Sequence, residues 1–273
     1  MKKNLRKVLI AVLAVIFVGS SAALLWQNME SKKSAELNAQ AEEIVTAQPE
    51  PVVELDPFPE DEEEEEVVEE VAPEKTYDDP TVATLRKMDF ASLQEENPDV
   101  LGWIIIPETE INYPLMQAED NDYYLTRLWD GTTNKNGSIF MDYKNDPEMG
   151  DYHTLIYGHR MRDGSMFAGL KDYNKKAFWE EHPMVYIGTA DQCYTYEIYA
   201  AYKAPVLGHT FQTPEFPDDA AKEAFVAESL KMSSIKTGVQ PTAADNVITL
   251  VTCTGTGYEH RWVVQACLRE IIE

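Results

Sequence analysis

The chain has 273 residues and a formal net charge of −25 at pH 7, with 48 acidic against 23 basic side chains. A surface this acidic repels phosphate groups, which argues against a nucleic-acid partner. The three cysteines, Cys193, Cys253 and Cys267, include no CxxC pair and are odd in number, which argues against a structural zinc site and a disulfide framework. A single Cys193–Cys267 disulfide stays open.

The N-terminus carries the pattern of a membrane anchor. Residues 1–7 hold four positive charges, and the next 19 residues, Val8–Trp26, hold none of either sign. This length matches a helix that crosses a bilayer, and the preceding charges predict that residues 1–7 stay in the cytoplasm. A cleaved signal peptide begins in the same way and is the alternative. We favour an uncleaved anchor at residues 8–26, which puts the rest of the chain outside the cell.

Residues 27–80 are interpreted as an acidic, disordered stalk. The segment "SKKSAELNAQAEEIVTA" can be partly helical, but "QPEPVVELDPFPEDEEEEEVVEEVAPEK" is dense in glutamate and proline and has little to bury. Its like charges repel one another and extend it. A specific acidic docking segment is the minor alternative.

From Thr81 the composition becomes that of a globular domain. Residues 81–100 predict one or two short helices with Asp89 as N-cap, and residues 164–183 and 217–235 predict two helical insertions. Between and after them lie eight short β-rich segments bounded by Gly, Pro, Asn, Asp or charges: Leu101–Ile106, Ile111–Met116, Gly137–Asp142, His153–Tyr157, Met184–Thr189, Tyr194–Tyr202, Asn246–Cys253 and Arg261–Leu268. The pattern predicts a mainly β fold, a β-barrel with helical insertions.

Cys253 ends one of these strands, and Arg261 begins the next. Strand periodicity places Cys253 on the same face as Val251, and Arg261 on the face opposite Trp262. If the two strands are neighbours joined by the "TGTGYEH" loop, Cys253 and Arg261 lie near one rim. A guanidinium there favours a thiolate and stabilises an oxyanion on an attacked carbonyl.

A thiol nucleophile needs a proton partner, and His159 is the candidate among five histidines. In "TLIYGHRMRDGSMF" an apolar strand runs into Gly158 and ends at His159, a position where barrels carry function. The residues therefore offer His159, Cys253 and Arg261 as one site, with a purely structural role for the histidine as the alternative. A metal site from His153, His159 and Cys253 is a weaker alternative, because no carboxylate pattern supports it.

These residues stand in segments that resemble sortases. "TLVTC" at Thr249–Cys253, Arg261 in "RWVV", and "TLIYGHRMRDGSMFAGL" resemble the active-site segments of that family. "VLGWIIIPETEINYPLMQAEDNDYYL" and "NGSIFMDYKND" look most like class B sortases. The resemblance covers about Thr81 to the C-terminus. It implies an eight-stranded sortase-type β-barrel with N-terminal helices and helical insertions, with residues 81–273 as the catalytic domain.

The resemblance also implies a function, that of a membrane-anchored cysteine transpeptidase on the outer face of a Gram-positive cell. Cys253 would attack the C-terminal sorting signal of a surface protein and form a thioacyl enzyme. His159 would protonate the leaving amine and deprotonate the incoming one, and Arg261 would stabilise the oxyanion. The acceptor would be an amine of peptidoglycan or its lipid-linked precursor, with no cofactor or metal.

Three further residues are candidates for the signal groove. Asn121 and Leu125 in "DNDYYL" match positions that line the groove in the family, and Thr252 is next to the nucleophile.

Two other functions compete with this interpretation. A pilin-polymerising sortase is expected to carry a second hydrophobic span near its C-terminus, and "CLREIIE" is not such a span. A non-catalytic adhesin or wall-binding module explains the anchor and the stalk equally well, but gives His159, Cys253 and Arg261 no role.

Overall fold

The computed structural model describes residues 2–47, 77–211, 215–255 and 257–273, without the side chains of residues 2–12, 14 and 15. Some of the side chains of the predicted span Val8–Trp26 therefore fall outside the described part of the chain, and residues 48–76 of the predicted stalk fall outside it entirely. Over the part of the chain that the structure describes, no helix has both the length and the apolar character to cross a bilayer.

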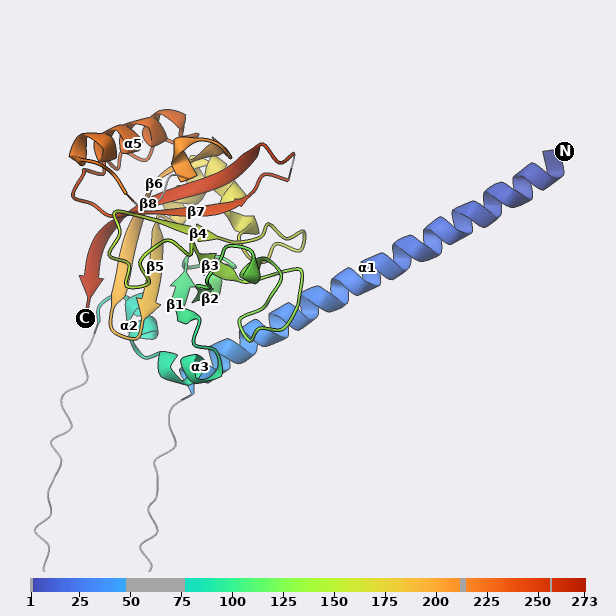
Figure 1. Cartoon of the computed structure of the whole chain (residues 1–273), viewed down its shortest axis with the longest axis horizontal. Coiled ribbons are helices and arrows are strands. Elements are labelled where there is room, and N and C mark those ends of the chain that lie inside the picture. The colour runs from blue at the N-terminus through green and yellow to red at the C-terminus, as the bar shows by residue number, and fades with distance from the viewer. Residues whose placement is uncertain (1, 48–76, 212–214, 256) are drawn as a thin grey trace, which may run out of the picture.

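Eight strands close into a single barrel, in the order β1-β2-β3-β4-β7-β8-β6-β5 (Figure 1). Their bounds are β1 Val100–Ile105, β2 Asn112–Met116, β3 Ile139–Met141, β4 His153–Tyr157, β5 Met184–Thr189, β6 Cys193–Pro205, β7 Val247–Cys253 and β8 His260–Ile272. The predicted β-barrel is confirmed, and each predicted strand is present with shifts only at its ends. β7 pairs with β4 in parallel and with β8 in antiparallel, so three strands that carry candidate site residues are neighbours.

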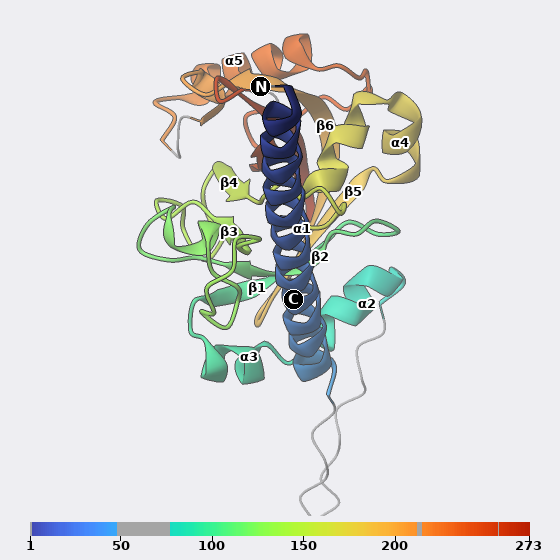
Figure 2. The same cartoon turned by 90° about the vertical axis from the view of Figure 1, so that its right-hand side faces the viewer.

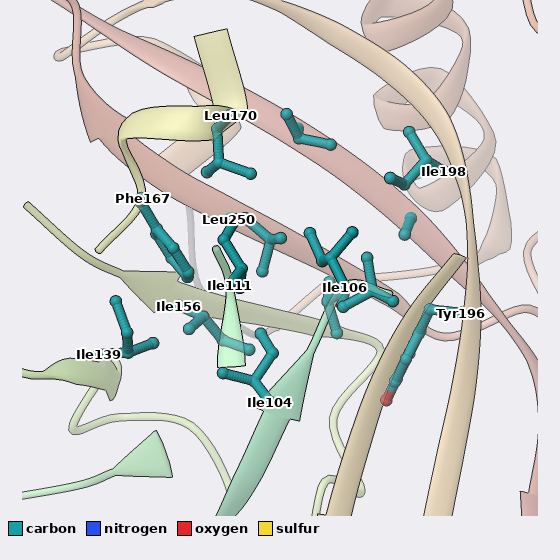
Figure 3. Close-up of a cluster of buried hydrophobic side chains, with 14 of the residues drawn as sticks. Ile104, Ile106, Ile111, Ile139, Ile156, Phe167, Leu170, Tyr196, Ile198 and Leu250 are labelled. Carbon is teal, nitrogen blue, oxygen red and sulfur yellow. The ribbon is translucent and has the colours of Figure 1, made fainter. Parts of the chain in front are cut away.

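The barrel interior is an apolar core to which every strand contributes alternate residues. Ile156 of β4 and Leu250 of β7 lie in it together with Ile104 of β1, as Figure 3 shows. Each such side chain stabilises the fold by about 1.5–3 kcal/mol when it leaves water. Because a one-residue slip would turn this set outward, the core fixes the register of β4, β7 and β8 and with it the position of any residue at their ends.

The short helices begin where the sequence supplies caps. The carboxylate of Asp79 accepts hydrogen bonds from the first turn of α2 (Pro80–Arg86), and Asp89 does the same for α3 (Phe90–Glu96), as predicted. The remaining short helices are η1 Tyr123–Leu125, η2 Ala168–Asn174, α4 Lys176–Glu181 and η3 His209–Phe211. Figures 1 and 2 show α2 and α3 at one end of the barrel and α5 (Asp219–Met232) at the other.

Helix α5 (Asp219–Met232) covers part of the outer face of the barrel. Its side chains Phe225 and Val226 form a buried cluster with outward-facing residues of β4, β7 and β8, among them Leu155, Val263 and Cys267. The outer face of these three strands is therefore buried under α5, and the cluster stops short of Cys253, which is exposed.

Helix α1 (Lys2–Thr46) is continuous, and its C-terminal half is packed on the barrel domain. Ala41 and Val45 are fully buried, the indole Nε1 of Trp129 donates to the carbonyl of Leu37 at 2.7 Å, and the backbone N–H of Asp89 donates to Val45 at 2.8 Å. The N-terminal half projects away from the barrel (Figure 1). Residues 27–46 of the predicted stalk, for which the sequence allowed partial helix, are thus helical and partly docked, because α1 offers apolar side chains and carbonyl oxygens that the domain binds.

Candidate active site

Strand pairing brings the ends of β4, β7 and β8 to one mouth of the barrel. In the parallel β4–β7 pair Tyr157 is level with Val251, and the backbone N–H of Gly158 continues the ladder by donating to Val251 at 3.1 Å. The next residue, His159, is therefore level with the end of β7, where Cys253 lies. In the antiparallel β7–β8 pair Cys253 is the direct partner of Arg261.

The three side chains emerge on the outer face of the barrel. Leu250 lies in the barrel core and Val251 in the cluster under α5, so the alternation of β7 turns Cys253 outward. The same parity applies to Arg261, which follows the pattern of outward-facing Val263. The predicted convergence of His159, Cys253 and Arg261 at one rim agrees with this register.

The cysteines differ sharply in their surroundings. All three are unpaired: Cys253 is exposed, whereas Cys193 and Cys267 are fully buried. Burial raises the pKa of each of the two buried thiols to about 11. The disulfide that the sequence left open is therefore absent, since Cys193 packs beside α2 and Cys267 under α5. Cys253 is the one cysteine that a substrate can reach.

The ring of His159 is oriented by the backbone of η1. Its Nε2 lies 2.7 Å from the carbonyl oxygen of Leu125. A carbonyl only accepts, so Nε2 carries the proton and Nδ1 is the nitrogen that can take up and release a second one. The half-buried imidazole is thus held in one tautomer at the end of β4, a suitable arrangement for a general acid and base.

The guanidinium of Arg261 is held by the loop that precedes it. Its Nη1 donates to the carbonyls of Tyr258 at 3.2 Å and His260 at 3.3 Å. Both bonds use the same nitrogen, so they do not require Nη2 or Nε. Arg261 is partly exposed beside an exposed thiol, where a planar cation can meet the oxygen of an attacked carbonyl.

The three residues predicted to line a substrate groove each make structural contacts. The amide of Asn121 bridges Asp142, to which it donates at 2.9 Å, and the N–H of Tyr143, from which it accepts at 3.1 Å. Leu125 supplies the carbonyl that orients the histidine. The buried Thr252 donates its hydroxyl hydrogen to the carbonyl of Gly158 at 2.8 Å and ties β7 to β4. A substrate-binding role for the three stays a prediction.

No role was predicted from the sequence for Gly158 and Arg160, the two neighbours of His159. A Cβ on Gly158 would lie 2.4 Å from Cδ1 of Ile139 and 2.7 Å from the ring of Phe167, both core side chains shown in Figure 3, so only glycine fits before the histidine. Arg160 donates from Nη1 to the carbonyl of Thr254 at 2.7 Å. The sequence signal for Arg160 was its position immediately after a candidate catalytic histidine. Its acceptor is a backbone carbonyl, which no sequence pattern marks.

The alternative metal site is not formed. His153 and His159 are six residues apart at opposite ends of β4, about 20 Å in an extended strand. His153 is fully buried, and its Nε2 lies 2.7 Å from Oγ1 of Thr249. Within the described ranges, no three His, Cys, Asp or Glu side chains are grouped so that they could hold a metal ion.

Comparison with known proteins agrees with this geometry. The model of the sortase domain matches residues 104–269, more than half of the chain. The chain belongs to the sortase family. It is 39% identical over 182 residues to sortase B of Listeria monocytogenes, a match that covers 66% of this chain and 74% of the relative. The family resemblance and its class B character are therefore confirmed, and the protein is a cysteine transpeptidase of the sortase type.

Solved structures of class B sortases share the fold. Sortase B of Bacillus anthracis in complex with AAEK1 superposes with a TM-score of 0.68 at 32% identity, covering 89% of this chain and 99% of that one. A complex of Staphylococcus aureus sortase B with its substrate gives a TM-score of 0.63 at 32% identity, covering 66% of this chain and 84% of that one. The high coverage of the former shows that the likeness extends beyond the barrel strands.

Proposed function

We propose that this sortase is a membrane-anchored enzyme that cleaves the C-terminal sorting signal of surface proteins and transfers them to an amine of peptidoglycan or its lipid-linked precursor. The observation that supports the proposal is the register of three neighbouring strands, in which Cys253 pairs with Arg261 and Tyr157, two residues before His159, pairs with Val251. The S. aureus sortase B solved as a complex with substrate supports a substrate-binding role for this fold.

The acylation step follows from the positions of the three side chains. Sγ of Cys253 attacks the scissile carbonyl carbon, and its proton moves to Nδ1 of His159. Arg261 and the N–H after Cys253 stabilise the negative oxygen of the tetrahedral intermediate. The C–N bond then breaks, and His159 returns the proton to the departing amine, which leaves an acyl group bonded to Cys253.

The transfer step reverses these roles with a different amine. The acceptor nitrogen attacks the thioester carbon, His159 removes the proton from that nitrogen, and the C–S bond breaks. The acyl chain ends up on the acceptor amine, and the thiol of Cys253 is regenerated. A sortase B has been solved in complex with triglycine, and this peptide is a suitable amine probe here.

The proposal places residues 1–7 in the cytoplasm, the anchor at Val8–Trp26 and the barrel outside the cell. Its support is the sequence, in which an uncharged stretch follows four positive charges. The test is extraction of vesicles that contain the full chain with alkaline carbonate. Retention of the protein in the vesicle fraction is expected, and its quantitative release would contradict the anchor.

The catalytic proposal is tested with the full chain in detergent and a panel of peptides with NPxTN-like and LPxTG-like signals, with and without triglycine. Mass spectrometry should report one cleavage site and a triglycine-linked product. Cys253→Ala should abolish both, whereas the buried Cys193→Ala serves as the matched control and should retain them. Cleavage by the Cys253→Ala variant would refute the nucleophile, and an inactive wild type would favour the non-catalytic module.

A further inference from the structure

Arg160 is fixed on the rim of the barrel directly after His159. Its backbone forms an isolated antiparallel bridge with Met166, and the N–H of Phe167 donates to the carbonyl of His159 at 2.9 Å. Phe167 in turn is a fully buried core residue. The backbone of Arg160 is therefore anchored to the barrel core.

From this base the Arg160 side chain reaches the loop that follows the nucleophile. Its Nη1 donates to the carbonyl of Thr254 at 2.7 Å, a short distance typical of a charge-assisted hydrogen bond. A Cβ added to Gly255 would lie 1.9 Å from the same nitrogen. The guanidinium thus lies directly against the backbone of Gly255, which has a φ of +80° that disfavours any other residue.

This contact restrains the residue whose N–H the reaction needs. Cys253 is held in β7 by its pairing with Arg261, and the carbonyl of Thr254 is held by Arg160. The N–H of Thr254, which follows the nucleophile, lies between these two fixed points.

We propose that Arg160 is a positioning residue that orients the Thr254 N–H toward the oxyanion formed when Cys253 attacks its substrate. Arg160 acts through the loop and does not touch the substrate, and Gly255 is the residue that makes room for it. The proposal rests on the acylation step described above. It assigns to the "GHR" segment a second function beside that of the histidine.

The test uses the full chain and compares Arg160→Gln with Arg162→Gln, an exposed arginine of the same loop, as the matched control. Removal of an oxyanion donor typically lowers kcat by 10²–10³-fold, so loosening one should lower it by about 10–100-fold, with KM changed less than about twofold. Arg160→Lys, which retains a charged donor, should recover part of the loss. Arg162→Gln should behave as wild type. Equal kcat for Arg160→Gln and wild type would overturn the proposal.

Gly255→Ala supplies an independent arm, because the added methyl group must displace the guanidinium. Its kcat should fall to a similar degree. The kcat of the Arg160→Gln/Gly255→Ala double variant should lie within about twofold of that of the less active single variant. Losses of kcat that multiply in the double variant would show that the two residues act separately and would overturn the proposal.

Amide hydrogen exchange of the β7–β8 loop tests whether Arg160 holds this loop, and it needs no peptide substrate. It therefore remains informative if the wild type cleaves no signal and the proposed function fails. Arg160→Gln and Gly255→Ala should each speed exchange in this loop at least fivefold, on the order of 1 kcal/mol of lost local protection, and leave β4 and β7 unchanged. Arg162→Gln should not change it. Unchanged loop exchange in Arg160→Gln would refute the proposal.

Discussion

The outer face of β4, β7 and β8 carries two rows of polar side chains, one at the mouth and one beneath α5. The mouth row is His159, Cys253 and Arg261. The covered row is His153, Thr249 and Gln265. Each row takes one residue from each of the three strands or their ends, yet the members of the mouth row are exposed or half-buried and those of the covered row are fully buried.

The covered row is joined by hydrogen bonds. Oγ1 of Thr249 lies 2.7 Å from Nε2 of His153 and accepts from Nε2 of Gln265 at 3.0 Å, while Oε1 of Gln265 accepts from the hydroxyl of Tyr199 at 2.9 Å. The ring of Phe225 from α5 lies 4.7 Å from that of His153. Buried polar groups must satisfy one another, so this row holds the structure together.

The mouth row differs because α5 does not cover it. Its members are held by backbone carbonyls at their edges, with the thiol of Cys253 exposed between them. The same residue types thus serve stability where the helix lies over the strands and chemistry where it does not. Substitutions should separate the two rows by what each loses.

The largest expected effect is that of His159→Ala on turnover. Loss of the group that moves the proton should lower kcat by about 10²–10⁴-fold, while the free energy of unfolding changes little. The measurement is steady-state peptide cleavage combined with urea unfolding. Turnover within threefold of wild type would remove His159 from the reaction.

Arg261→Lys keeps the charge but loses the planar fork. Because the second donor after Cys253 remains, we expect kcat to fall by about 10–100-fold with folding intact. Cleavage rates and the circular dichroism spectrum of the variant test this. A rate near that of wild type would mean that Arg261 serves only to hold the loop through Tyr258 and His260.

In the covered row, Thr249→Val keeps the shape of the side chain but leaves His153 and Gln265 without their shared partner. The unfolding free energy should fall by about 1–3 kcal/mol, the usual penalty for buried groups left unsatisfied. Turnover per folded molecule should stay within about twofold. Urea unfolding and active-site titration give the two numbers, and a variant of unchanged stability would show that the network is not needed.

The smallest effect is the pH dependence of stability caused by Cys267. Burial raises the pKa of this thiol from 9.0 to about 11, so the folded state keeps a proton that the unfolded state loses between these values. The stability contribution is complete below pH 9 and declines as the pH rises toward 11. The free energy of unfolding, measured under reducing conditions below and above pH 9, should show the decline. Cys267→Ala should make this decline shallower. An unchanged slope of unfolding free energy against pH would contradict a contribution from Cys267.

Alternation of apolar residues was sufficient to predict the strands and the face of Cys253 and Arg261. The alternation of apolar residues is a local property of the chain, and burial of the apolar face in the core fixes the strand register accordingly. The proximity of His159 to Cys253 follows from the parallel pairing of β4 with β7, which the local pattern does not show.

The docking of α1 and the role of Arg160 were not predicted, for a common reason. Several acceptors of these contacts are backbone carbonyls, those of Leu37 and Val45 in α1 and that of Thr254 for Arg160. Carbonyl groups are present at every residue, so the sequence alone does not mark which of them will be bound.

The most direct test of Cys253 as the nucleophile is peptide mapping of the enzyme after a rapid acid quench of its reaction with a cleavable signal peptide. We expect the acyl fragment of the signal as a thioester on Cys253, with Cys193 and Cys267 unmodified. An acyl fragment on either buried cysteine, or full cleavage without any modification of Cys253 at any time, would contradict this mechanism.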